Sequence, residues 1–207
     1  MNHWSHYIAV TIAGYLIGSF PTGVVLTRRK YGIDVREKGS GNIGATNVTR
    51  VFGWYAGVLV FLVDFFKGYL PIWAVNKYFP GDHWMAFLAA FSLVLGHCFS
   101  LFLKGKGGKG VATSFGVIVV VLPWAAAVAA VVYAILLLVT RISALGSLGG
   151  LAATCIYLLI SEPPRPISLL ILGISAVVIF RHRANIERLW GDFKARKQPT
   201  AKRKAKR

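Results

Sequence analysis

The sequence predicts an all-α integral membrane protein with seven transmembrane helices, an outside N-terminus and a cytoplasmic C-terminus. Three observations lead to this fold class. Hydrophobic residues make up 56% of the chain, charged residues only 15%, and the mean hydropathy is +0.60, which is more apolar than an ordinary soluble domain. Apolar stretches recur along all but the last part of the 207 residues. Basic residues gather in alternate segments between these stretches.

Each apolar stretch is interpreted as one crossing, because about 20 residues span the hydrocarbon core. The first-to-last order is 6–27, 51–78, 84–103, 111–122, 124–140, 143–160 and 167–180. Gly68 and Pro71 interrupt the second stretch, which we expect to be a single tilted or kinked crossing. Pro123 is expected to form an outer turn. The stretch before it is short, which predicts a half-helix whose end is buried in protein.

The distribution of charge predicts the orientation. The formal net charge is +17. All but three of the 24 Lys and Arg residues fall on segments that this topology places in the cytoplasm; the exceptions are Lys67, Lys77 and Arg165. Such a bias is the positive-inside pattern. Sorting by membrane span also argues against a nucleic-acid partner.

The predicted domain organisation is one membrane domain over residues 1–193 and a basic cytoplasmic tail over 194–207, expected to be disordered. Eleven of the basic residues lie between Arg181 and Arg207. We expect the tail to be attracted to anionic lipid, at about 1 kcal/mol per basic residue near the surface.

Two glycine-rich loops on the predicted cytoplasmic side indicate an anion site. The first covers residues 39–50 and the second residues 104–113. Glycines allow backbone N–H groups to approach a ligand closely, and hydroxyls, amides and cations complete a phosphate cradle. Both loops contain a GxGxxG spacing, but neither follows a strand of a βαβ unit, and no Walker A string occurs. These observations argue against a dinucleotide-binding fold and a P-loop.

Helix N-termini are expected beside both loops. Thr46 and Asn47 are candidates to cap a helix that begins at Val51, after Arg50, and a second helix is expected to begin near Val111. Such ends favour anions. The lysines preceding the second helix are Lys104, Lys106 and Lys109. Together with Arg50 they could balance two phosphate groups, which carry about three to four negative charges.

Three further polar features lie in or beside the apolar stretches. Asp64 and Lys67 form an i, i+3 pair inside a crossing, where charges are costly; we interpret them as a structural pair that joins two helices, with substrate contact as the alternative. His97 ends a crossing near the second loop, and we interpret it as structural. The five histidines and few acidic residues give no pattern typical of a metal site.

The last motif follows the final crossing. His182 and Asn185 are one helical turn apart and share a face. A histidine near neutral pKa is suited to relay a proton or to donate to an oxyanion. His182 and Glu187 also fit an HxxxxE spacing, similar to the HxxxxD of conventional glycerolipid acyltransferases, but the acid differs and both lie in a basic stretch.

Together these segments resemble the bacterial acyl-phosphate:glycerol-3-phosphate acyltransferase family, the PlsY type. The resemblance spans nearly the whole chain apart from the tail, in the family's order. The matching segments are GSGNIGATNVTR (39–50), DFFKG (64–68), GHCFSLFLKGKGGKGVATSFG (96–116), TRISALGS (140–147) and HRANIERL (182–189). Ala144 and Gly146 replace hydroxyl residues of the family pattern, which leaves Ser147 as the candidate in that segment.

The resemblance implies a multi-pass enzyme of the bacterial cytoplasmic (inner) membrane. Such an enzyme transfers an acyl group from acyl phosphate to the sn-1 hydroxyl of glycerol 3-phosphate. The products are lysophosphatidic acid and phosphate, in the first step of phospholipid synthesis. No metal or cofactor is implied. Docking of a soluble enzyme that produces the acyl phosphate, of the PlsX type, is a further role expected for the basic tail. Two other functions stay open at this point: a transporter for an anionic metabolite, and a membrane-anchored nucleic-acid or ribosome binder.

The resemblance also implies roles for individual residues. The expected catalytic residues are Arg50, Lys109, His182 and Asn185. The expected substrate-binding residues are Ser40, Gly41, Asn42, Gly44, Thr46, Asn47, Lys104, Gly107, Gly108, Gly110 and Ser147. Whether His182 or the phosphate of glycerol 3-phosphate accepts the proton is left open.

Overall fold

The computed structural model describes residues 3–197, and the prediction of an all-α fold is confirmed there, because these residues contain helices and no strand. In chain order the α-helices are α1 (His3–Ser19), α2 (Thr22–Tyr31), α3 (Ala45–Phe52), α4 (Trp54–Tyr78), α5 (His83–Cys98), α6 (Val111–Val121), α7 (Pro123–Thr140), α8 (Ser143–Ser161), α9 (Arg165–Arg181) and α10 (Arg183–Lys197). Two short 3-10 helices, η1 (Val35–Glu37) and η2 (Leu101–Leu103), lie in the connecting segments.

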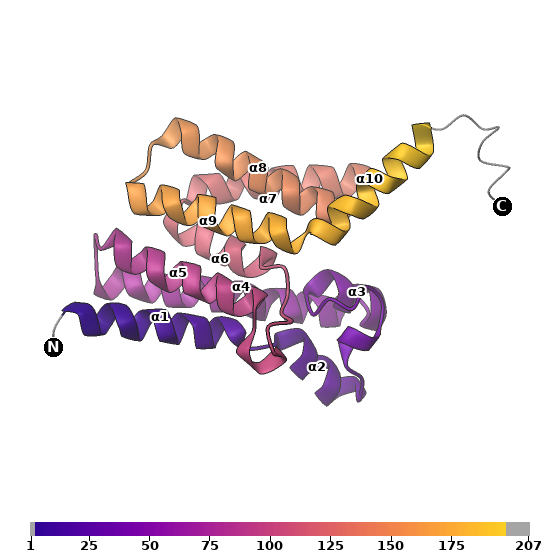
Figure 1. Ribbon diagram of the computed structural model, residues 1–207, viewed down its shortest axis with the longest axis horizontal. Coiled ribbons are helices and arrows are strands. Elements are labelled where there is room, and N and C mark those ends of the chain that lie inside the picture. Colours follow the sequence, from indigo (N-terminus) through magenta and orange to yellow (C-terminus); the bar gives the residue numbers. More distant parts are fainter. Residues whose placement is uncertain (1–2, 198–207) are drawn as a thin grey trace.

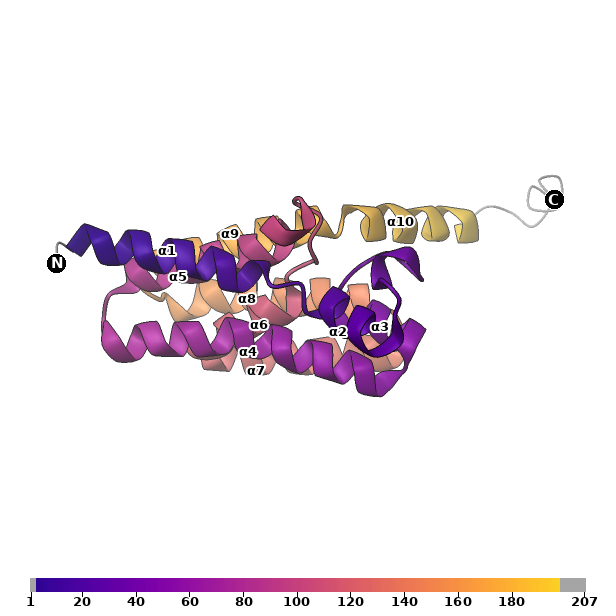
Figure 2. The same ribbon diagram turned by 90° about the horizontal axis from the view of Figure 1, so that it is seen from below.

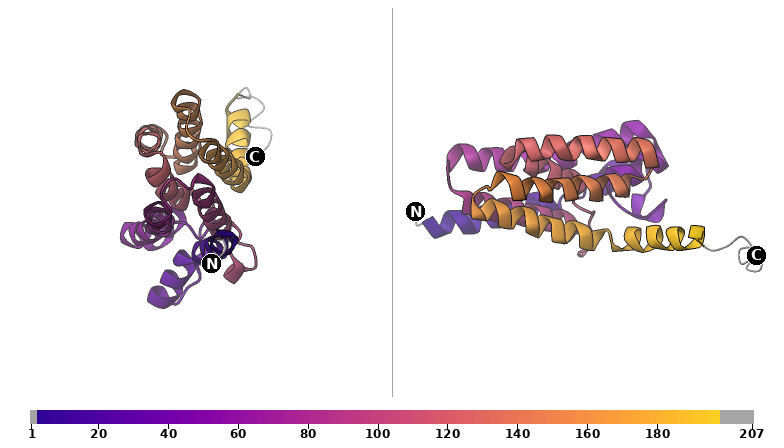
Figure 3. Two further views of the ribbon diagram at one scale, coloured as in Figure 1. Left: turned by 90° about the vertical axis from the view of Figure 1, so that its left-hand side faces the viewer. Right: turned by 90° about the horizontal axis from the view of Figure 1, so that it is seen from above.

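The longer helices run side by side along the long axis of the molecule (Figures 1 and 2). Helix α6 lies in the middle, where it contacts α4, α5, α7 and α9. Helices α1, α4 and α5 lie to one side of it and α7, α8 and α9 to the other, as the end-on view in Figure 3 also shows. The short helix α6 is therefore surrounded by protein, which is the setting expected for a half-helix in a membrane.

The helices follow the predicted apolar stretches. Within residues 3–197, five segments are long and apolar enough to cross a membrane: Trp4–Tyr31, Trp54–Tyr78, His83–Leu103, Pro123–Thr140 and Ser143–Ser161. Helix α9 meets that test only together with α10, from which it is bent by 60°, and α6 has 11 residues. Seven crossings and the orientation of the termini therefore stay predictions.

The helix bounds can be compared with the two predictions made at proline residues. Helix α4 is continuous through Gly68 and Pro71, as expected for a single crossing. The chain leaves helix α6 at Leu122, and α7 begins at Pro123, so the predicted break there is confirmed. Proline is well suited to the first turn of a helix, because its missing N–H has no partner there in any case.

Small residues let two helix pairs approach closely. A Cβ added at Gly18 of α1 would lie 2.0 Å from the carbonyl oxygen of Leu93 in α5. Between α4 and α6, a Cβ at Gly116 would lie 2.2 Å from the carbonyl oxygen of Phe65. In a bilayer, where the hydrophobic effect does not drive helices together, such close packing is a main source of association.

The direction of the helices brings distant loops to one end of the bundle. The segments 32–44 and 99–110, the α7–α8 connection and the α9–α10 junction all lie there (Figures 1 and 3). The connections that follow α4, α6 and α8 lie at the opposite end. The two glycine-rich loops therefore share an end with the HRANIERL motif.

Helix α10 continues beyond the bundle (Figure 1). It ends at Lys197, so residues 194–197 of the predicted tail are helical. The rest of that tail, with its expected contacts to lipid or to a PlsX-type enzyme, lies outside the described residues.

Candidate active site

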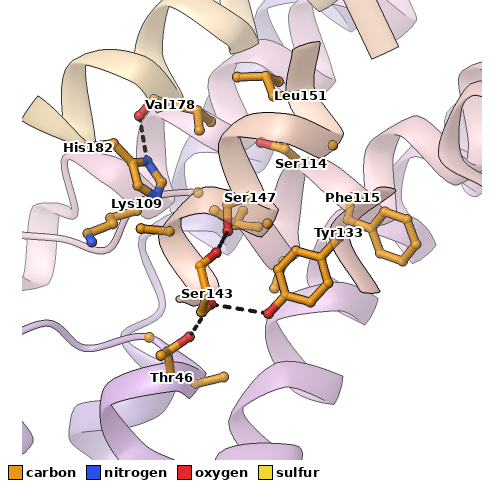
Figure 4. A pocket seen from close by; sticks show the side chains of 18 of the residues that line it. Thr46, Lys109, Ser114, Phe115, Tyr133, Ser143, Ser147, Leu151, Val178 and His182 are labelled. Atoms are coloured by element: carbon orange, nitrogen blue, oxygen red, sulfur yellow. Dashed lines mark hydrogen bonds between the residues drawn. The ribbon is translucent and has the colours of Figure 1, made fainter. Parts of the chain in front are cut away.

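A cavity of about 620 Å³ lies where these loops meet. Its wall includes residues from the segments 40–50 and 109–118, from α7 and α8, and from the α9–α10 junction. Figure 4 shows side chains from these parts turned toward one another. The predicted site residues on the wall are Ser40, Asn42, Gly44, Thr46, Asn47, Arg50, Lys109, Gly110, Ser147, His182 and Asn185. The predicted residues that do not line it are Gly41, Lys104, Gly107 and Gly108.

Asn47 organises the first loop. Its Oδ1 accepts a hydrogen bond from the backbone N–H of Ser40 (2.8 Å), and its Nδ2 donates to the carbonyl oxygens of Val35, Lys38 and Asn42 (3.3, 3.1 and 2.9 Å). The residue is 2% exposed. Since its donors and acceptor are engaged within the loop, the side chain acts as a scaffold that shapes the binding surface.

The helix after the first loop begins earlier than predicted. Helix α3 starts at Ala45, with Gly44 as its N-cap, and α4 starts separately at Trp54. The expectation that Thr46 and Asn47 cap a helix beginning at Val51 is therefore wrong. The physical reason is that the polar side chains close the loop on itself: Asn42 Oδ1 accepts from the N–H of Gly44 at 2.9 Å.

The start of the first loop is fixed by a buried carboxylate. Asp34 accepts hydrogen bonds from Arg36 and forms ion pairs with Arg36 (2.7 Å) and Arg28 (2.8 Å). The hydrogen bond from Arg36 is the main cause that lowers the pKa of Asp34 to about 2. The carboxylate stays ionised at neutral pH, and its contribution to stability is lost only as the pH falls from the ordinary range of an aspartate toward 2.

The second loop presents Lys109 to the cavity. Its Nζ donates to Oδ1 of Asn185, which joins the loop to α10. Burial, followed by the charges of Arg188, Arg181 and Arg50, lowers the pKa of Lys109 to about 8. Gly110 is the N-cap of α6 and has a φ of 83°, a conformation that favours glycine. The backbone turn at Gly110 therefore aims the start of α6 and Lys109 at the same space.

Lys104, Gly107 and Gly108 have other positions in the loop. Lys104 is exposed and lies away from the cavity wall. Gly107 and Gly108 are buried against α5. A Cβ at Gly108 would lie 2.2 Å from Nε2 of His97. These two glycines are therefore required for packing on His97.

His182 is held in one tautomer. It follows α9 directly, is 2% exposed and lies on the cavity wall. Its Nδ1 lies 2.8 Å from the carbonyl oxygen of Val178. Because a carbonyl only accepts, we assign the proton to Nδ1, which leaves the lone pair of Nε2 available. Figure 4 shows the ring beside Lys109.

Asp64 and Lys67 form the predicted structural pair. Their ion pair is 2.8 Å long, Thr22 donates to Asp64 at 2.8 Å, and Lys67 donates to the carbonyl oxygen of Phe20 at 3.0 Å. The pair thus joins α4 to the α1–α2 junction. His97 is also bonded within the protein, with Thr113 Oγ1 at 3.2 Å from Nδ1. Asp64 and His97 nevertheless reach the cavity wall.

Sequence reasoning missed several wall residues. Ser143 Oγ lies 3.1 Å from both Thr46 Oγ1 and Tyr133 Oη, which connects the first loop to α7 and α8. Arg141 and Arg188 add two cations to the wall. Arg188 could have been found from its position in the HRANIERL motif, roughly one helical turn after Asn185.

The cavity has a cationic part and an apolar part. Arg50, Lys109, Arg141 and Arg188 line it, while its carboxylate, Asp64, is neutralised by Lys67. Apolar side chains and small residues continue the wall between α6, α7 and α8; they include Phe115, Ile118, Ala129, Ala130 and Leu151. In the part of the chain that the structure describes, no group of three or more His, Cys, Asp or Glu could hold a metal ion. This arrangement suits an amphiphile with an anionic head.

Comparisons with known proteins identify the family to which this chain is similar. The model of a family described as "Glycerol-3-phosphate acyltransferase" matches residues 8–192. A protein of that name from Anaeromyxobacter dehalogenans is 46% identical over 86% of this chain and 90% of its own length, and one from Aquifex aeolicus is 40% identical over 87% and 93%. Two crystal structures of PlsY, an integral membrane glycerol 3-phosphate acyltransferase, superpose on the chain. Its glycerol 3-phosphate form has a TM-score of 0.86 at 39% identity, covering 90% of this chain and 92% of PlsY. Its lysophosphatidic acid form has a TM-score of 0.84 at 38% identity, with the same coverage.

Proposed function

Because the chain belongs to the glycerol-3-phosphate acyltransferase family and is a multi-pass membrane acyltransferase, we propose a specific donor and acceptor for it. The donor is an acyl phosphate, and the acceptor is the sn-1 hydroxyl of glycerol 3-phosphate. The observation that carries the proposal is one cavity lined by cations from both glycine-rich loops, Arg50 from the first and Lys109 from the second. Both substrates are phosphorylated, so each needs cations that bind its phosphate group.

The two phosphate groups are assigned to different walls. Ser40, Asn42, Thr46 and Arg50, on the first loop and α3, hold glycerol 3-phosphate, and the hydrogen bonds of Asn47 keep that surface in shape. The phosphate of the donor lies by Lys109, Asn185, Arg188 and the N-terminus of α6, where Gly110 allows close approach; helix N-termini favour anions. Ser147, whose hydroxyl donates to the carbonyl oxygen of Ser143 at 2.9 Å, supports the wall between them.

The reaction is an acyl transfer from a mixed anhydride. The acceptor oxygen attacks the acyl carbon, a new C–O bond forms, and the C–O bond to phosphate breaks with the electron pair leaving on phosphate. Fixed cations and N–H groups stabilise the charge that develops on the departing phosphate. Holding both reactants in one cavity supplies the remaining effect, because orientation turns a bimolecular step into an effectively unimolecular one.

We assign the proton of the attacking hydroxyl to the phosphate of glycerol 3-phosphate. His182 Nε2 accepts a hydrogen bond from the neighbouring sn-2 hydroxyl and so orients the glycerol backbone, which leaves the single proton of the sn-1 hydroxyl for the phosphate. A proton on His182 would add a positive charge beside Lys109, which Figure 4 shows next to the ring. The substrate dianion carries opposite charge and is the better acceptor there. Metal ions and cofactors have no part in the proposed reaction.

We further place the cavity on the cytoplasmic side of a bacterial inner membrane. The basic segments and the cavity share one end of the bundle, which is the cytoplasmic end if the positive-inside rule holds. The N-terminus is then outside. The transporter and nucleic-acid alternatives are set aside, because the family is an acyltransferase family.

The donor is tested with purified protein in detergent, labelled glycerol 3-phosphate, and either acyl phosphate or acyl-CoA. We expect labelled lysophosphatidic acid with acyl phosphate and none with acyl-CoA. Formation of product from acyl-CoA alone would overturn the choice of donor. Acyl carrier protein loaded with the same chain is the matched third donor.

The preference of the enzyme for acyl chains of a given length is expected to depend on Ala130, which lines the apolar part of the cavity. Ala130→Phe fills that space, and forcing a long chain past it costs about 1–3 kcal/mol by analogy with overpacked cores. The ratio of kcat/KM for palmitoyl phosphate to that for decanoyl phosphate should fall by about tenfold or more. Ala134→Phe, on an exposed face of α7 outside the cavity wall, is the control and should leave the ratio unchanged.

Activity is expected to decline above about pH 8, because the pKa of Lys109 in the free enzyme is lowered to about 8. A lysine is cationic below its pKa and neutral above it, so the loss occurs as pH rises. Since kcat/KM reports ionisations of the free enzyme, its profile should fall about tenfold per pH unit on that limb. Lys109→Arg should move the limb to higher pH; a limb that stays in place assigns it to another group.

A further inference from the structure

Arg181, the last residue of α9, grips the second glycine loop from one side. Its Nε donates to the carbonyl oxygen of Gly108 at 2.9 Å, and its Nη2 donates to that of Gly107 at 2.7 Å. The guanidinium also lies over the ring of Phe99, 5.4 Å from its centroid. Two parallel donors in one plane are a geometry that arginine provides and lysine does not.

His97 holds the same loop from the other side. Its carbonyl oxygen accepts a hydrogen bond from the N–H of Gly108 at 3.0 Å. A Cβ at Gly107 would lie 2.1 Å from that carbonyl oxygen. The backbone of residues 107 and 108 is thus fixed between α5 and α9, and the next residue, Lys109, projects from this fixed backbone to Asn185.

Arg181 itself is not on the cavity wall, whereas its neighbour His182 is. One short stretch of chain therefore holds the loop of Lys109 and also carries the imidazole. We propose that Arg181 is a positioning residue. It fixes the loop that carries Lys109 to the end of α9, beside His182, and so sets the distance between Lys109 and His182. This proposal rests on the proposed roles of Lys109 and His182.

A direct contact between Arg181 and a substrate phosphate is the competing explanation, and it makes a different prediction. A phosphate contact needs the charge, which Arg181→Lys keeps. Two simultaneous hydrogen bonds to the carbonyl oxygens need the planar pair of donors, which Arg181→Lys loses. The free guanidinium ion, supplied to Arg181→Ala, can make both bonds again.

The test compares Arg181→Ala and Arg181→Lys with Arg183→Ala. Arg183 is the neighbouring arginine, exposed, with its guanidinium over the ring of Phe180 and one long hydrogen bond of 3.4 Å to the Phe180 carbonyl oxygen. We expect both Arg181 variants to lose about a hundredfold in kcat, the cost of an approximately 1 Å misplacement, and Arg183→Ala to stay near wild type. Guanidinium, well below denaturing concentrations, should restore activity to Arg181→Ala only.

Hydrogen–deuterium exchange supplies a readout that does not depend on catalysis. Residues 104–113 should exchange faster in Arg181→Ala than in the wild type or Arg183→Ala, while thermal unfolding of the two alanine variants stays similar. Unchanged exchange, or Arg181→Lys with near-normal kcat, would overturn the positioning role. A wild type that is inactive with acyl phosphate would overturn the proposed function instead, and exchange would still decide the proposal about Arg181.

Discussion

Replacing Lys109 with alanine is expected to lower kcat/KM for acyl phosphate by about 10²–10³-fold, the range found when one donor to a developing oxyanion is removed. Lys109 is the lysine of the second loop that lines the cavity, and its partner there is Asn185. The substitution removes a partly desolvated cation from the proposed position of the leaving phosphate. Steady-state kinetics with varied acyl phosphate measures the effect.

The control for Lys109 is a lysine of the same loop. Lys106 is exposed and does not line the cavity, so Lys106→Ala should change kcat/KM by less than about threefold, as for an exposed charge distant from the reaction. The two variants carry the same change in net charge. Equal losses of kcat/KM in both variants would mean that the loop acts only through its net positive charge, and the specific role of Lys109 would be refuted.

Replacing His182 with glutamine is expected to lower kcat by about 10²-fold, because the attacking hydroxyl is no longer aligned. The imidazole is fixed by its bond to the Val178 carbonyl oxygen, whereas the flexible amide of glutamine is not. The KM for glycerol 3-phosphate should change little, since its phosphate is held at the other wall. Single-turnover measurements with labelled glycerol 3-phosphate separate the chemical step from binding.

The pH dependence of the His182→Gln variant distinguishes an orienting acceptor from a general base. If the substrate phosphate takes the proton, the acid limb near its second pKa of about 6 persists in the variant. If His182 takes the proton, that limb is lost along with the imidazole. Glu187→Gln is the control for an HxxxxE mechanism; Glu187 is exposed and absent from the cavity wall, so this variant should behave as wild type.

Hydropathy and charge predicted the helices because membrane crossings obey strong length and polarity constraints. The short helix α6 and the break at Pro123 followed from the same constraints. The glycine loops and the HRANIERL motif were visible because glycine and clustered polar residues are rare beside apolar stretches. The glycine loops and the HRANIERL motif form one cavity because successive helices run in opposite directions and return the chain to the same end of the bundle.

The details of the site depended on tertiary contacts that local sequence does not encode. Asn47 looked like a helix cap, but its amide donates to the carbonyl oxygens of Val35, Lys38 and Asn42. Gly107 and Gly108 were predicted to bind phosphate, and the sequence did not show that they also pack closely against His97. Arg181 looked like an ordinary basic residue at the end of a crossing, and only its distances to the loop carbonyl oxygens lead to the positioning role that we propose.

A structure with glycerol 3-phosphate and a non-hydrolysable acyl phosphonate bound together would test the two-substrate cavity most directly. We expect both phosphorus atoms inside it, one beside Arg50 and the other beside Lys109, with His182 Nε2 facing the sn-2 hydroxyl and the acyl chain between α6, α7 and α8. Either phosphorus atom outside this cavity, or both ligands competing for the Lys109 wall, would contradict the account.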